Sequence, residues 1–123
     1  MAEQIKSWVI EIPNWTPVTL NSLINCHWAT RGKRKKIDRD MIAFYGASIP
    51  KAERPRRIKL TITLGPKQKG ADPDAFWKGL LDSLVHVGLL VNDSKEWVVL
   101  DPVQFERGKE RATRIELFDL DCV

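Results

Sequence analysis

The stretch RIKLTITLGPKQKGADPDAFWKGLLDSLVHVG, residues 57–88, changes its hydrophobic period halfway and therefore contains two different elements. Apolar and polar residues alternate from Arg57 to Leu64, which predicts a half-buried β-strand. From Asp74 onwards the apolar residues recur at helical spacing, which predicts a helix with Asp74 as N-cap and Gly88 at its end. The turn-prone segment 65–70 separates the strand from the helix.

Further strands are predicted on both sides of this unit. Residues 5–12 (IKSWVIEI) alternate and predict a strand that Pro13 ends. Residues 97–100 and 113–120 predict two more strands, which we expect to form an antiparallel pair joined by a polar turn around Gly108. Strand, helix and strand in succession favour a right-handed parallel crossover. We therefore expect one α/β (α+β) domain, residues 1–123, with a small mixed sheet and about two helices packed on it.

The segment before the central strand predicts a second helix and a basic loop. Ile37, Met41, Phe44 and Ile49 have roughly helical spacing, so we expect a helix that begins near Ile37, with aspartates in its first turn, and ends before Pro50. Residues 31–36, RGKRKK, are basic except for the glycine and have no apolar period. We expect this basic run to form a loop or the tip of a hairpin.

The composition is that of a folded domain without membrane segments. Hydrophobic residues make up 43% and charged residues 29% of the chain, which argues against wholesale disorder. No stretch reaches the roughly 18 apolar residues of a membrane-spanning helix, and the N-terminal sequence MAEQIKSW lacks the apolar core of a signal peptide. Two distant cysteines without CxxC spacing predict reduced thiols. We expect a cytoplasmic protein that does not bind membranes.

The net charge of +4 conceals an asymmetry along the chain. Residues 1–70 contain 14 Lys and Arg against 5 Asp and Glu, whereas residues 71–123 contain 6 against 11. A basic surface beside an acidic cluster suits a protein that binds a polyanion and holds a cation against it. The alternative is that ordinary solvated surface charge is unevenly distributed.

Two aspartates flank the predicted junction between strand and helix. Asp72 and Asp74 are two residues apart, so in an extended segment their carboxylates point the same way. Converging carboxylates repel one another unless a cation is bound, and their oxygens suit Mg²⁺ or Mn²⁺. Asp93 would complete this metal site if the chain beyond Gly88 returned past the start of the helix. The sequence spacing permits that path.

Lys78 and Asp82 continue the pattern at intervals of four residues. Asp74, Lys78 and Asp82 can therefore form two ion pairs on a solvated helix surface, and for Asp82 this structural interpretation is the better one. For Lys78 the functional alternative is that its ammonium group stabilises negative charge on a phosphate.

These residues together resemble the RusA-type Holliday junction resolvases of bacteria and their phages. That family has an Asp-x-Asp pair, a lysine, a further aspartate, a helix that ends at glycine, and an Asp-Asp or Asn-Asp pair. In this chain the matching residues are Asp72, Asp74, Lys78, Asp82, Gly88, Asn92 and Asp93. Residues 24–36, INCHWATRGKRKK, are similar to the family at Asn25, at Trp28 and in the basic run.

The resemblance implies a homodimer that binds a four-way DNA junction and cuts two symmetry-related strands with Mg²⁺, in recombination and repair, with Mn²⁺ as a substitute. It makes Asp72, Asp74 and Asp93 the metal ligands, Lys78 a catalytic lysine and Asp82 a supporting residue. The chain departs from the family at Ala75, where asparagine is usual, and at Asn92, where aspartate is common. Neither departure removes a metal-binding carboxylate, so they affect the support of the site and the choice of substrate.

The expected DNA contacts come mainly from the basic run. We expect the backbone phosphates to be bound by Arg31, Lys33, Arg34, Lys35 and Lys36, together with Arg56, Arg57 and Lys59. Trp28 would stack on an unpaired base or, equally well, pack against the protein. The resemblance adds Asn25 to the DNA contacts.

Two other functions fit the same residues. One is a nuclease of phage origin that acts on flaps, forks or other branched DNA, because the basic surface does not determine the substrate. The other is a catalytically inactive nucleic-acid-binding module, in which the aspartates are only caps and surface charge.

Overall fold

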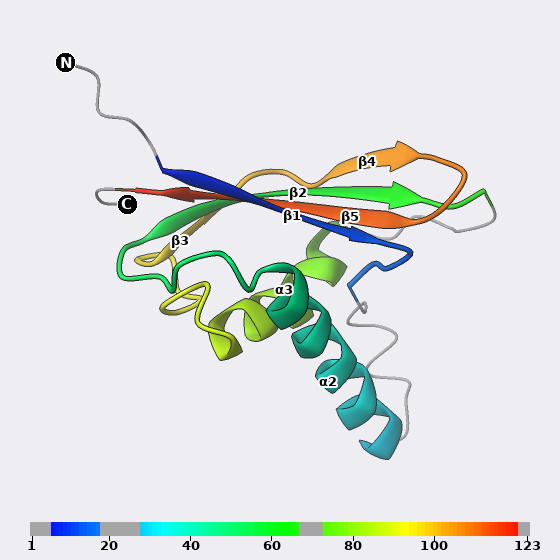
Figure 1. Cartoon of the computed structure of the whole chain (residues 1–123), viewed down its shortest axis with the longest axis horizontal. Coiled ribbons are helices and arrows are strands. Elements are labelled where there is room, and N and C mark those ends of the chain that lie inside the picture. Colours follow the sequence, from blue (N-terminus) through cyan, green and yellow to red (C-terminus); the bar gives the residue numbers. More distant parts are fainter. Residues whose placement is uncertain (1–5, 18–27, 67–72, 121–123) are drawn as a thin grey trace.

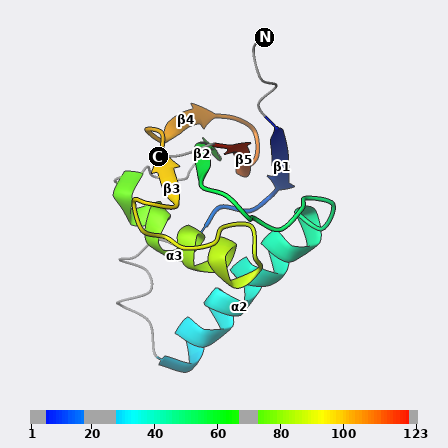
Figure 2. The ribbon, with the colours of Figure 1, turned by 90° about the vertical axis from the view of Figure 1, so that its left-hand side faces the viewer.

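The computed structural model describes residues 6–17, 28–66 and 73–120, and for 28–31 and 73–75 it describes the backbone alone. In chain order the elements are β1 (Ser7–Pro13), α2 (Trp28–Tyr45), β2 (Arg56–Leu64), α3 (Pro73–His86), β3 (Val98–Leu100), β4 (Gln104–Arg107) and β5 (Ala112–Asp119). Both helices lie on one face of the mixed five-stranded sheet, and the other face is open (Figures 1 and 2). The chain is a single small α+β domain, as predicted.

Strand β2 is the centre of the sheet. It pairs with β5 in antiparallel orientation along one edge and with β3 and β4 in parallel orientation along the other. β1 pairs with the far edge of β5, again antiparallel. The predicted alternation in β2 is confirmed, because Ile58, Leu60 and Ile62 are completely buried against the helices. The predicted parallel arrangement of the strands before and after α3 is confirmed as well.

The predicted pairing of the last two strands is wrong. The predicted partners, β3 and β5, pair with opposite edges of β2. Strand β4, which the sequence did not predict, precedes the turn at Gly108 and pairs on the same edge as β3. The turn therefore passes over the end of β2, where the Gly108 N–H donates to the Leu64 carbonyl at 3.0 Å. A Cβ at Gly108 would lie 2.9 Å from Cγ2 of Thr63, so this close approach requires glycine.

Helix α3 begins and ends with recognisable signals. It starts at Pro73, where a missing N–H costs nothing, so Asp74 lies in the first turn and is not the predicted N-cap. Its end is the predicted one. Gly88 has a φ of +86°, and the N–H groups of Leu89 and Gly88 donate to the carbonyls of Leu84 and Val85. This is a Schellman motif, which satisfies carbonyls that the helix end would leave without partners.

Helix α2 differs from the prediction at its start. It begins at Trp28 rather than near Ile37, so the basic run forms the first half of a helix and not a loop or a hairpin tip. Lysine and arginine are good helix formers, and the single Gly32 costs only about 1 kcal/mol relative to alanine. The missing apolar period therefore did not signal a loop.

The buried face of α2 also differs from the predicted one. Ile42 is fully buried and Asp38 is 4% exposed, whereas Ile37 is 55% and Phe44 74% exposed. Asp38, expected in the first turn, lies in the middle of the helix, and its Oδ1 accepts a hydrogen bond from Nε1 of buried Trp15 at 3.1 Å. A hydrogen-bonded carboxylate thus occupies a position where the apolar pattern predicted a solvent-facing residue.

Among the described residues, neither α2 nor α3 is long and apolar enough to cross a membrane.

Candidate metal and nucleic-acid site

The first half of α3 carries the residues predicted to perform chemistry. The backbone of Asp74 lies in the first turn, Lys78 is exposed one turn later, and Asp82 is half-buried a further turn along. This places Lys78 on the solvent side of the helix, where its ammonium group can reach a bound anion. Asp72 lies outside the described residues.

Asp93 lies in an exposed turn after α3. The Ser94 N–H donates to Oδ1 of Asn92 at 3.1 Å, so Asn92, a departure from the family pattern, stabilises this turn locally. The turn leads directly into β3, whose first residue pairs with Arg56, the first residue of β2. Asp93 therefore lies near the beginning of β2.

The start of α3 lies near the other end of β2. The ring of Phe76 in α3 contacts Phe105 of β4, with 5.9 Å between centroids, and Phe105 pairs with Ile62 of β2. Ile62 follows Arg56 by six positions along the strand, which corresponds to roughly 20 Å. Among the described side chains, which exclude those of Asp72 and Asp74, no three Asp, Glu, His or Cys residues form a group that could hold a metal ion. The chain beyond Gly88 thus does not return past the start of α3, and Asp93 does not join Asp74 within one chain. A metal site at Asp72 and Asp74 stays a prediction.

The end of the basic run of α2 lies beside the middle of α3. Side chains on α2 and α3 line a small hollow between the two helices: Lys35, Asp38, Arg39, Gly79, Asp82 and Ser83. Nearer their C-terminal ends, Ile42 and Gly46 share a second hollow with Val87 and Leu89. Because both hollows follow the chain in the same order, the two helices run in the same general direction. They cross, so the N-terminal part of α2 extends away from α3 (Figure 2).

The predicted DNA contacts on α2 differ in exposure. Lys33 and Lys36 are exposed, and Arg34 and Lys35 are half-buried. Arg31 and Trp28 belong to the first turn of α2, of which only the backbone is described, and Asn25 lies outside the described residues. The structure thus gathers four of the predicted basic side chains along one helix.

The predicted role of Arg56 in binding DNA is wrong. Its side chain is only 2% exposed and forms an ion pair with Asp119 at 2.8 Å. Its other guanidinium nitrogens donate to the carbonyls of Leu89 and Pro50, each at 3.0 Å, and its Cζ lies 4.6 Å from the centre of the Trp8 ring. All of its charged group is used inside the protein, so Arg56 stabilises the fold.

Arg57 and Lys59 lie on the open face of the sheet, away from the helices. Arg57 forms an ion pair with Asp101 at 2.8 Å. Because their neighbour Ile58 faces the helices, the side chains of Arg57 and Lys59 face the opposite way from α2. They therefore do not share a surface with the basic run of α2, and their contact with DNA stays a prediction.

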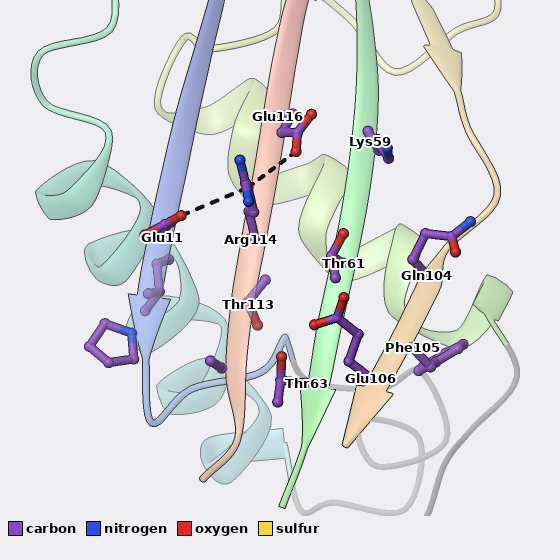
Figure 3. Close-up of a pocket in the computed structure, with 13 residues that line it drawn as sticks. Glu11, Lys59, Thr61, Thr63, Gln104, Phe105, Glu106, Thr113, Arg114 and Glu116 are labelled. Atoms are coloured by element: carbon purple, nitrogen blue, oxygen red, sulfur yellow. Dashed lines mark ion pairs between the residues drawn. The ribbon is translucent and has the colours of Figure 1, made fainter. Parts of the chain in front are cut away.

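The open face also contains a broad hollow of about 790 Å³, which the sequence reasoning missed (Figure 3). At its centre Arg114 lies between Glu116, at 3.1 Å, and Glu11, at 3.8 Å. Lys59 and Glu106 add one charge of each sign to the lining. The mixed charges make this a poor surface for a polyanion. The outward-facing threonines and lysine of β2 were its only signal in the sequence.

Comparisons of the chain with models of protein families and with curated proteins found no match. The likeness to the RusA-type resolvases thus rests on the residues of segments 24–36 and 72–93.

Proposed function

We propose that this protein is a Mg²⁺-dependent endodeoxyribonuclease that resolves four-way DNA junctions by paired, symmetric nicks in the cytoplasm, in recombination and repair. One observation carries the proposal: α2, whose first half is basic, crosses α3 at a hollow lined by Lys35 and Asp82, about one turn beyond Lys78. A surface that binds phosphates therefore adjoins the residues proposed to cut them.

The donor set suits a hard divalent cation. Asp72 and Asp74 offer only carboxylate oxygens, which Mg²⁺ prefers and Mn²⁺ accepts. Asp93, near the beginning of β2, lies roughly 20 Å from the start of α3 and is not assigned to the same ion. Mg²⁺ bound at Asp72 and Asp74 would lower the pKa of a bound water and neutralise charge on the phosphate.

Lys78 and Asp82 act beside the metal ligands. Lys78 is exposed one turn after Asp74, so its ammonium group can stabilise negative charge on the phosphate that is cut. Asp82, four residues later and half-buried, lies within reach of Lys78 on the same helix face and of Lys35 and Arg39 across the hollow. It supports the position of these cations.

Binding of the junction is assigned to α2 and the segment before it. Arg31, Lys33, Arg34, Lys35 and Lys36 contact backbone phosphates, which gives salt-sensitive binding with little preference for sequence. Asn25 and Trp28 contact the DNA near the crossover. A homodimer matches the two-fold pseudo-symmetry of a four-way junction.

The test is the cleavage of labelled DNA by the wild type and Asp72→Asn, with Mg²⁺ or EDTA present. The substrates are a synthetic four-way junction, a flap and a linear duplex of the same sequences. The proposal predicts Mg²⁺-dependent paired nicks in the junction alone, which Asp72→Asn abolishes.

Two other results would replace the proposal. Cleavage of the flap in preference to the junction would keep the chemistry and change the substrate. Binding of the junction without cleavage under any condition would make the protein a binding module.

A further inference from the structure

Helix α2 exposes large apolar side chains on the face that points away from α3. Phe44 is 74% and Ile37 55% exposed, and Tyr45, whose ring packs edge-on against Phe44 at 5.1 Å, is 36% exposed. Ile37 and Phe44 are seven residues apart, so they lie on one face of the helix, two turns from each other. Heptad spacing of apolar residues is typical of a seam between two helices.

Charged residues of both signs border this apolar stripe. Lys33, Lys36 and Asp40 are all exposed. Within the described part of the chain none of the three forms an ion pair. Lys33 precedes Ile37 by four residues and Asp40 precedes Phe44 by four, so each charge lies one turn before an apolar residue on the same side.

We propose that this stripe is the contact surface for a second copy of the chain, with the two α2 helices antiparallel about a two-fold axis. An axis that passes midway between residues 38 and 39 places Asp40 level with Ile37 of the second copy, one residue from its Lys36 and about one turn from its Lys33. The same axis places Phe44 about one turn from Ile37 of the second copy. In this arrangement the exposed apolar residues of the two copies contact one another, and each Asp40 lies near lysines of the other copy.

The charge pattern favours a second copy over DNA on this stripe. Asp40 lies between Ile37 and Phe44 along the helix and would repel phosphates, whereas a second copy offers it two lysines. In the dimer the phosphate contacts of α2 then come from Arg31, Arg34 and Lys35. The inference deepens the proposed function, because it names the contact surface of the homodimer included there. Its tests contain no DNA, so its failure is distinguishable from failure of the nuclease proposal.

Sedimentation velocity over a dilution series tests the surface. From Lys33 to Phe44 the stripe is about 16 Å long, short for a stable interface, so we expect a dimer that dissociates on dilution. Phe44→Lys should raise the dissociation constant at least about tenfold, because it places a charge in the seam. Val9→Lys is the matched control, because Val9 is 47% exposed on the open sheet face, far from the stripe. This variant should dimerise like the wild type.

Charge reversal tests the pairing directly. Asp40→Lys should weaken the dimer, and the triple variant Asp40→Lys, Lys33→Asp, Lys36→Asp should restore it. Circular dichroism of each variant checks that α2 is still folded. A wild type that is monomeric throughout, a Phe44→Lys dimer as strong as the wild type, or a triple variant that stays as weak as Asp40→Lys would each overturn the proposal.

Discussion

A single arginine connects several parts of the fold. Arg56 begins β2 and forms an ion pair with Asp119 at the end of β5. It also donates to the carbonyls of Pro50, before β2, and Leu89, after α3. Removing one partner of a buried ion pair leaves the other charge without compensation, which costs about 3–5 kcal/mol. Arg56→Ala should therefore lower the free energy of unfolding by about that amount, as measured by urea denaturation.

The neighbouring Arg57 is the matched control for this prediction. It also forms an ion pair at 2.8 Å, but its side chain is 52% exposed. Solvent weakens such pairs, so Arg57→Ala should cost at most about 1 kcal/mol. Equal losses of stability in the two variants would contradict the account of Arg56.

The contact between Trp15 and Asp38 is a second test at the scale of the residue. The indole N–H donates to a carboxylate that is only 4% exposed. Trp15→Phe removes the donor and keeps most of the apolar ring, so we expect a loss of about 1–3 kcal/mol in the free energy of unfolding. An unchanged midpoint in urea would show that this hydrogen bond does not stabilise the protein.

At the scale of the element, the sequence predicted best where one face of an element is uniformly apolar. The alternating pattern identified β2 and the helical stripe identified α3, because the inward positions of these elements are almost all Ile, Leu, Phe or Trp. Burial of such faces dominates their stability, so the pattern and the structure agree.

The prediction failed where burial does not follow hydrophobicity. The buried face of α2 includes Asp38, while its exposed face includes Ile37 and Phe44. All four residues of β4 are exposed, so its sequence QFER has no inward apolar face to detect. The edge of β2 that accepts β4 is decided by the tertiary fold, which local patterns do not encode.

Two glycines test the assignment of the helices. Gly32 lies inside α2 with no atom within 4 Å of an added Cβ, so Gly32→Ala should stabilise the protein by about 0.5–1 kcal/mol. Gly88, at a φ of +86°, should instead lose about 1–2 kcal/mol on substitution by alanine. Thermal denaturation measures both. A destabilised Gly32→Ala would contradict the extension of α2 through the basic run.

At the scale of the whole molecule, the two faces of the sheet differ in charge. The helical face carries the basic half of α2, and the open face carries acids and bases in similar number. The sequence predicted the basic run and the carboxylate spacing. It did not predict which cations share a face. Arg56, Arg57 and Lys59 are close together in the sequence, but Arg56 is buried, Arg57 is paired with Asp101, and Lys59 faces away from α2.

Two half-buried lysines on opposite faces test this division. Lys35 lies on α2 beside α3, and Lys59 lies on the open face. Lys35→Ala should weaken junction binding and reduce the slope of log K against log[salt] by about 1, because one phosphate contact is lost. Lys59→Ala should leave both quantities unchanged. The reverse result would place the DNA on the open face.

The central claim is that α3 begins with a metal-dependent cutting site and that other residues bind the DNA. The most direct test measures binding and nicking of a four-way junction on the same samples of wild type, Asp74→Asn and the control Asp101→Asn, which alters a carboxylate paired with Arg57. Asp74→Asn should bind like the wild type and nick at least about 100-fold more slowly, since even residues that only support metal ligands cost 10–100-fold. Nicking by Asp74→Asn at the wild-type rate would contradict the claim.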